Sequence, residues 1–259
     1  MTLEKETKVA VVTGVGRRRS IGAALARGLA ADGWSLVLNH WKPYDDRLGL
    51  ESSPGDAAAI AAGCRAEGVA VELVSGDLSD PGVPAALVAA GRKLGPVTGL
   101  VVSHCESVDS SILTTSVESW DRHFAVNARA PWLLIKAFAE QLPAVPPGEV
   151  AGRIVALTSD HTVHNLPYGA SKGALDRIVI SAARELGHLG ISANVVNPGP
   201  IDTGWMDDDV RRSLVPDQPT GRLGLPTDIA DVVAFLVSKP GRWISGQLLH
   251  VDGGFSARF

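Results

Sequence analysis

Tyr168 and Lys172 are the two side chains of this 259-residue sequence best suited to chemistry. They stand four positions apart near the start of an expected helix, so both lie on one helix face. A phenol with an ordinary pKa of about 10 exchanges protons poorly at neutral pH unless a nearby cation stabilises the phenolate. Because the Lys172 ammonium can supply that charge, the pair predicts acid/base chemistry at Tyr168.

A glycine-rich segment near the N-terminus is the second feature that points to chemistry. It stands between an apolar run at 9–13 and an Ala-rich helical stretch at 21–31. Glycines let the backbone approach a pyrophosphate closely, and the free amides at a helix start hold its charge. The segment predicts a dinucleotide site; the alternative is a tight turn without a ligand. The expected cofactor-binding residues are Gly14, Gly16, Arg17, Arg18, Arg19, Ser20, Ile21 and Gly22.

The end of the second apolar run indicates which dinucleotide is bound. NAD-selective sites place an acidic residue there against the ribose 2′-hydroxyl, whereas this chain has Asn39, His40, Trp41 and Lys42. The arginines at 17–19 offer cations to a 2′-phosphate, so NADP(H) is favoured over NAD(H). His40, at the end of the second apolar run, is also an expected cofactor-binding residue. Which arginine binds stays open, and each has the alternative of being simply solvated.

Short β-branched runs alternate with amphipathic stretches along the whole chain. This rhythm predicts a doubly wound α/β fold with a mostly parallel seven-stranded sheet, helices on both faces, and one domain over residues 1–259. The expected strands are 9–13, 35–39, 69–75, 100–103, 154–158, 191–197 and 247–251. The expected helices are 21–31, 54–67, 81–93, 117–141, 167–189 and 226–237.

Composition narrows the class of protein. The net charge of −4 and the pI near 6.0 leave no global basic field, so neither a nucleic acid nor a membrane is an expected partner. No segment reaches the ~18 uncharged apolar residues that a membrane helix needs. The two cysteines, Cys64 and Cys105, are too few for a disulfide scaffold. Together these features predict a cytoplasmic protein with free thiols.

Further residues at strand and helix positions complete a recognisable pattern. Asp77 follows the third expected strand, Asn127 stands in the long middle helix, and Ser159 follows the fifth strand. Pro198, Gly199 and Thr203 follow the sixth strand. Residues 246–254 form a glycine-rich segment that contains the last expected strand and the turn after it. With the glycine segment and the Tyr168 pair, the chain resembles the short-chain dehydrogenase/reductase family over essentially its whole length, in particular bacterial 3-oxoacyl-reductase-like members.

The resemblance implies a Rossmann-like fold and a role for each matching residue. Tyr168 would protonate a carbonyl oxygen as a hydride arrives, Ser159 would hydrogen-bond that oxygen, and Lys172 would hold the nicotinamide ribose. Asn127 would anchor a water that feeds protons to Lys172. The cofactor residues implied beyond the glycine segment are Asp77, Leu78, Tyr168, Lys172, Pro198, Gly199, Ile201 and Thr203. The substrate would be a small ketone or secondary alcohol, and the helices at 117–141 and 167–189 would form a homodimer or homotetramer.

Two other functions are alternatives to this reading. The glycine segment spans eight positions rather than six, as in divergent enoyl-carrier-protein reductases, but those enzymes separate Tyr and Lys by six residues rather than four. A non-catalytic NADP(H)-binding sensor is the alternative from a different class. Binding alone would not require a phenol and an amine on one helix face, so Tyr168 and Lys172 argue against a sensor.

Departures from the family pattern fall where a substrate would bind. His104 and Cys105 stand after the fourth strand, where the family has small residues. His104 is either a substrate contact or a structural histidine, and we favour the structural role. Cys105 is interpreted as a packing residue. The loop from Ser159 to Tyr168 spans nine positions and is shorter than is usual in the family. Because this shortening can shift which hydroxyl lies beside Tyr168, Thr158 is an alternative to Ser159. The shortened loop carries Asp160, His161 and His164, which could line a polar substrate pocket. With no evident third ligand, no metal site is expected.

A long excursion at 199–224 follows the sixth strand and has the properties of a lid over the substrate. Trp205 and Met206 are its candidates for apolar substrate contacts, the alternative being that they pack within the lid. Leu133 and Leu189 stand where carrier-protein-dependent ketoacyl reductases tend to show docking arginines. Carrier-bound substrates are therefore not supported.

Overall fold

Seven apolar segments form one sheet in the computed structural model, which describes residues 8–257. The order is β3-β2-β1-β4-β5-β6-β7 and every pairing is parallel, so the predicted doubly wound α/β fold is confirmed. The strands are β1 (Lys8–Val12), β2 (Trp34–His40), β3 (Val71–Ser75), β4 (Val97–Val102), β5 (Gly152–Leu157), β6 (Ile191–Asn197) and β7 (Leu248–His250). All seven residues of β6 are buried, as expected of a strand covered on both faces.

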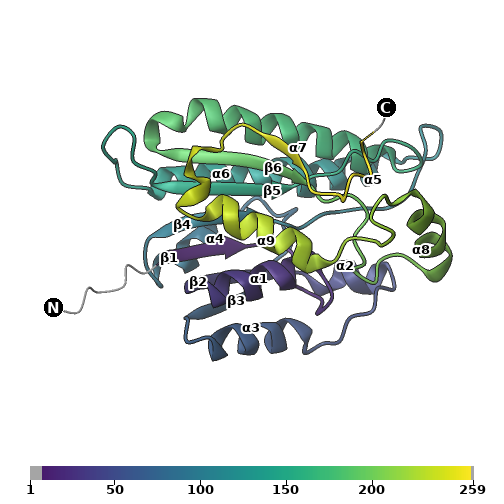
Figure 1. The fold of residues 1–259 in the computed structure, drawn as a ribbon, viewed down its shortest axis with the longest axis horizontal. Helices are drawn as coiled ribbons and strands as arrows, with labels where there is room; N and C mark the ends of the chain where they lie inside the picture. Colours follow the sequence, from purple (N-terminus) through teal and green to yellow (C-terminus); the bar gives the residue numbers. More distant parts are fainter. Residues whose placement is uncertain (1–7, 258–259) are drawn as a thin grey trace.

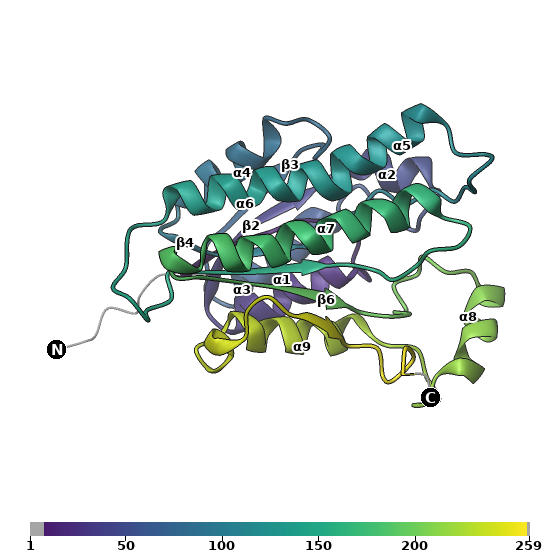
Figure 2. The same ribbon diagram turned by 90° about the horizontal axis from the view of Figure 1, so that it is seen from above.

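Helices cover both faces of the sheet (Figures 1 and 2). One apolar core joins the sheet to α1 (Ile21–Ala31), α3 (Asp56–Ala66) and α9 (Pro226–Val237). A second core joins the opposite face to α4 (Val83–Arg92), α6 (Ala130–Gln141) and α7 (Leu166–Glu185). Figure 2 shows the sheet between these two layers.

The middle helix differs from the continuous helix expected over 117–141. It consists of α5 (Val117–Phe124), a π-helical turn at Ala125–Arg129, and α6. Pro131 has no N–H to donate to the carbonyl of Asn127 four residues earlier, so regular α-helical bonding is interrupted here. The N–H of Ala130 instead reaches the carbonyl of Ala125, five residues back. The interruption coincides with Asn127, one of the expected catalytic residues.

Two short helices lie in segments that were expected to be connections. α2 (Lys42–Arg47) follows β2 and has Pro43 in its first turn. α8 (Asp208–Leu214) lies inside the expected lid, and Asp207 caps it by accepting a hydrogen bond from the N–H of Val210. These proline and aspartate signals are present in the sequence, but the segments are short and lack apolar periodicity. Both helices lie at the same end of the sheet (Figure 1).

Across residues 8–257, no helix combines the length and the apolar character needed to cross a bilayer. Cys64 is buried, Cys105 is half-buried, and neither forms a disulfide. The cytoplasmic location expected from the sequence stays a prediction.

Candidate active site

The residues singled out in the sequence converge on a cavity of about 670 Å³ at the carboxyl ends of the strands, which we call the main cavity. Its lining includes the following of them: Gly14, Gly16, Arg17, Ser20, Ile21, Gly22, Asp77, Leu78, His104, Cys105, Thr158, Ser159, Asp160, His161, His164, Tyr168, Pro198, Gly199, Ile201, Thr203, Trp205 and Met206. Lys172 and Asn127 are buried behind this surface. Arg18, Arg19 and His40 do not belong to the lining as the structure describes it.

Tyr168 lies in the first turn of α7, and Lys172 follows one turn later. The Lys172 ammonium is 5.7 Å from the centroid of the Tyr168 ring and donates a hydrogen bond to the carbonyl of Leu157 at 2.8 Å. Burial raises the pKa of Tyr168, and the Cys105 thiol acts in the same direction, while a hydrogen bond with the Ser159 side chain opposes it. Burial lowers the pKa of Lys172. The phenol is therefore protonated at neutral pH.

Ser159 and Thr158 are distinguished by their partners. Both line the main cavity, but the Thr158 hydroxyl donates to the carbonyl of Lys172 at 3.4 Å and is buried. The Ser159 side chain lies near enough to Tyr168 to act against the rise in the pKa of the phenol. Of the two candidates, Ser159 is therefore the one placed beside the phenol.

The shortened loop before α7 lies directly against that helix. A Cβ on Gly169 would come within 2.1 Å of the carbonyl oxygen of His161, so any larger residue at 169 would push the loop away. His161 and His164 are exposed at the rim of the main cavity. Within residues 8–257 the structure contains no cluster of three or more His, Cys, Asp or Glu side chains arranged to hold a metal ion.

Asn127 ties the middle helix to the loop after β4 and to α7. Its amide nitrogen donates to the carbonyl of Glu106 at 2.8 Å and to the hydroxyl of Ser171 at 2.9 Å, and its amide oxygen accepts from the N–H of Glu106 at 2.8 Å. The side chain is thus fully used in positioning these elements. Pro131, four residues later, has no N–H to offer the main-chain carbonyl of Asn127.

His104 is held inside the protein by both ring nitrogens. Nε2 donates to the carbonyl of Val126 at 2.9 Å, and Nδ1 accepts from the Thr13 hydroxyl at 2.7 Å. Burial lowers the pKa of His104 to about 3, with the Lys172 charge acting in the same direction, so the ring is neutral. With both nitrogens engaged, the geometry favours the structural interpretation over a substrate contact.

The glycine loop has the shape that a pyrophosphate requires. A Cβ on Gly22 would lie 2.3 Å from the carbonyl oxygen of Gly14, and Gly14 itself has a φ of +76°, which favours glycine. The Ser20 hydroxyl caps α1 by accepting from the N–H of Ala23, and the first turn contains no acidic residue. The amides of Ile21 and Gly22 have no acceptor within the helix. These residues therefore fit a dinucleotide's pyrophosphate.

The three loop arginines are all paired with carboxylates, which the sequence did not reveal. Arg18 Nε lies 2.7 Å from Asp56, and Arg19 Nη2 lies 2.9 Å from Asp202. Arg17 lines the main cavity, where its Nε lies 3.3 Å from Asp45 and its Nη1 donates to the carbonyl of Thr203 at 3.1 Å. The end of β2 itself contains no acid, as the sequence shows, but Asp45 of the following helix α2 also lines the main cavity beside Arg17.

A second ion-pair cluster, also missed from the sequence, surrounds Glu106. Its carboxylate is buried and pairs with Arg47 of α2 and, at 3.1 Å, with Arg122 of α5. Arg122 also reaches Asp77 at 2.9 Å. Glu106, Asp77 and Arg122 all line the main cavity. No sequence signal connects these residues, since four different segments meet here.

Part of the lining of the main cavity is apolar. Trp205 and Met206 belong to it together with residues from α8 and the C-terminal segment, namely Val210, Leu214 and Phe255. Trp205 is 42% exposed. The side chain is therefore only partly covered by the rest of the protein.

Asn165, just before α7, also lines the main cavity. Its amide nitrogen donates to Asp109 at 2.9 Å and to Ser107 at 3.0 Å. Because a carboxylate only accepts, the nitrogen must face Asp109, which leaves the oxygen, Oδ1, as the remaining atom. Oδ1 is buried without a hydrogen-bond partner among the described residues.

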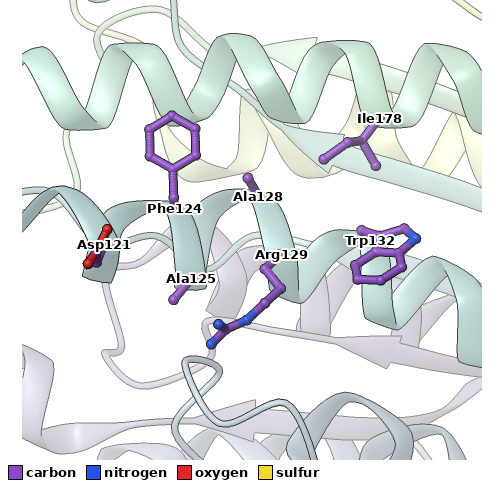
Figure 3. Close-up of a pocket in the computed structure, with 7 residues that line it drawn as sticks. All are labelled: Asp121, Phe124, Ala125, Ala128, Arg129, Trp132 and Ile178. Atoms are coloured by element: carbon purple, nitrogen blue, oxygen red, sulfur yellow. The ribbon is translucent and has the colours of Figure 1, made fainter.

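A separate hollow of about 530 Å³ lies between the middle helix and α7, and we call it the helix groove. Figure 3 shows Phe124, Ala128 and Trp132 of the middle helix facing Ile178 of α7. Trp132 is 51% exposed. The groove contains none of the expected catalytic residues.

Comparison with known proteins places this geometry in context. Residues 14–256 match the family model described as "Enoyl-(Acyl carrier protein) reductase". An uncharacterised oxidoreductase of Bacillus subtilis, YjdA, is 34% identical over 96% of this chain and 97% of its own. A dehydrogenase/reductase structure from Sinorhizobium meliloti has a TM-score of 0.85 at 29% identity, covering 98% of this chain and 96% of that one. A metagenomic blue fluorescent protein in complex with NADPH has a TM-score of 0.83 at 34% identity, covering 97% and 98%.

Proposed function

Because this chain belongs to the short-chain dehydrogenase/reductase family, we propose that it interconverts a ketone and a secondary alcohol with NADP(H), acting as one nucleotide-binding domain over its whole length. The observation that carries the proposal is the placement of Tyr168 in the main cavity, between Ser159 and the buried Lys172. The bound nicotinamide supplies or accepts the hydride.

The protein's own residues perform the proton chemistry. In reduction, the protonated Tyr168 hydroxyl donates its proton to the carbonyl oxygen, and Ser159 hydrogen-bonds the same oxygen. The Lys172 cation stabilises the phenolate that remains. The Asn127 side chain joins α7 to the loop after β4 through its hydrogen bonds to Ser171 and to the carbonyl of Glu106. The main-chain carbonyl of Asn127 offers a place for the water that returns a proton.

Replacing Ser159 by Ala is expected to lower kcat/KM by about 100-fold, because one hydrogen bond to the developing oxyanion is lost. Thr158→Val is the matched control, since it removes the Thr158 hydroxyl at nearly the same side-chain volume, and it is expected to stay within about threefold of wild type. Steady-state kinetics measures both. The opposite ranking, with Thr158 the more sensitive position, would assign the role to Thr158.

NADP(H) is the proposed cofactor because Arg17 lines the main cavity and a structural relative is complexed with NADPH. Arg17→Ala is expected to weaken NADPH binding about tenfold or more and NADH binding little, since only NADPH offers a 2′-phosphate to the guanidinium. Arg18→Ala and Arg19→Ala, whose side chains are paired with Asp56 and Asp202, serve as controls. Fluorescence titration measures each Kd. Equal losses for both nucleotides in Arg17→Ala would contradict this assignment.

The walls of the main cavity favour a substrate with an apolar body. Trp205, Met206 and Phe255 contribute apolar and aromatic surface to its lining. The exposed imidazole of His161 offers a polar contact. An apolar, preferably aromatic ketone matches these groups better than a small charged keto acid.

We propose that the protein is a homotetramer built on two apolar faces. The first is the helix groove with Trp132; the second surrounds the edge strand β7, where Trp243 is 91% exposed. Trp132→Glu and Trp243→Glu are each expected to give dimers, and the double variant monomers, because a buried charge opposes each contact. Light scattering after size exclusion measures the mass. A monomeric wild type would contradict the proposal.

The enoyl reductase and sensor alternatives are separated from ketone reduction by one experiment. The purified protein is titrated with NADPH and NADH and then supplied with ketones, secondary alcohols and enoyl thioesters. We expect NADPH binding followed by ketone turnover, since Tyr168 and Lys172 are four residues apart rather than the six of the divergent enoyl reductases. Turnover of enoyl thioesters alone would favour the first alternative, and binding without any turnover the second.

A further inference from the structure

Asp45 places a carboxylate against the glycine loop. Its side chain is 10% exposed and that of Arg17 is 12% exposed, so the pair is largely removed from solvent. A Cβ on Gly16 would lie 3.0 Å from Asp45 Oδ2, so the carboxylate closely approaches the loop backbone. Both Asp45 and Arg17 line the main cavity beside the residues that fit a pyrophosphate.

The charges around Asp45 are otherwise neutralised in pairs. Lys42 pairs with Asp46 on the exposed side of α2, and Arg18 pairs with Asp56. Arg17 and Asp45 are the remaining cation and anion. Arg17 Nε lies 3.3 Å from Asp45 Oδ1, and both side chains line the main cavity. Arg17 is held independently by the carbonyl of Thr203, so it keeps an anchor when Asp45 is changed.

We propose that Asp45 is a specificity-determining residue that limits the preference of this protein for a 2′-phosphorylated dinucleotide. This inference rests on the proposed NADP(H)-dependent function. A carboxylate accepts a hydrogen bond from a ribose hydroxyl and repels a phosphate, whereas Arg17 attracts the phosphate. The two side chains therefore act in opposite directions on the same part of the ligand, and NADH retains measurable affinity beside NADPH.

The test is Asp45→Asn in the full chain, which removes the charge and keeps the shape of the side chain. Fluorescence titration with NADPH and NADH gives the ratio of the two Kd values. We expect the ratio to shift about tenfold toward NADPH, since the repulsion of a nearby phosphate disappears and an acceptor for the 2′-hydroxyl weakens. Asp46→Asn, which changes the adjacent exposed carboxylate, is expected to leave the ratio within about twofold of wild type.

Thermal melting shows whether each variant is folded, and Asp45→Ser provides a second removal of the charge with a smaller side chain. A ratio that is unchanged in both folded variants, or that shifts toward NADH, would overturn the inference and make Asp45 a support for Arg17 only. If wild type binds neither nucleotide, the proposed function fails as well. Normal wild-type binding with an unchanged variant ratio refutes the inference alone.

Discussion

Tyr168→Phe is expected to reduce ketone turnover by at least about 1,000-fold while leaving the Kd for NADPH within about twofold. The substitution removes one oxygen atom, and that oxygen is the only proton donor that the proposed chemistry places at the carbonyl. The ring remains and keeps its packing in the first turn of α7. Single-turnover kinetics with saturating NADPH measures the chemical step, and fluorescence titration measures binding.

Tyr44 provides the matched control, because it is the other of the two tyrosines in the sequence and also lines the main cavity. Burial raises the pKa of Tyr44, as it does that of Tyr168. Tyr44 lies in α2, where its neighbouring cation is the Arg47 guanidinium, 5.6 Å from the ring centroid and already paired with Glu106. Tyr44→Phe is expected to retain turnover within about tenfold. Full activity in Tyr168→Phe would refute the acid/base role of Tyr168.

Lys172→Met is expected to lower kcat/KM by about 1,000-fold and to move the pH dependence of the remaining activity. In wild type, burial raises the pKa of Tyr168, so the phenol is protonated across the neutral range. Reduction needs this proton and is expected to fall only at alkaline pH, whereas alcohol oxidation needs the phenolate and rises with pH. Without the Lys172 cation the phenolate is less stable, so the pKa of Tyr168 rises further and the oxidation profile shifts to higher pH.

Two measurements separate this electrostatic role from a structural one. Methionine fills a volume similar to that of lysine without a charge, and thermal melting checks that the buried position still packs. The pH profile of alcohol oxidation is then compared between wild type and Lys172→Met. A large loss of rate with an unchanged profile would indicate that Lys172 only supports α7 through the carbonyl of Leu157.

The sequence alone predicted the parallel sheet and most helix positions, because both faces of the sheet are buried and the apolar runs are therefore uninterrupted. The helix Ile21–Ala31 and the strand Ile191–Asn197 have the predicted bounds. The middle helix does not, since Pro131 and the contacts of Asn127 introduce a π-helical turn that periodicity alone does not reveal. Local signals describe the bonding within a segment but not the contacts that perturb it.

The sequence by itself also indicated the chemistry proposed for the candidate site, since the residue types and spacing of Tyr168, Lys172 and the glycine segment are visible without a structure. Only the tertiary structure decided which charges face the main cavity. Arg17, Arg18 and Arg19 are equivalent in the sequence, yet each pairs with a carboxylate from a different segment, at Asp45, Asp56 and Asp202. The physical reason is that ion pairs depend on distances between atoms, and those distances are set by how α2, α3 and the lid pack around the ends of the strands.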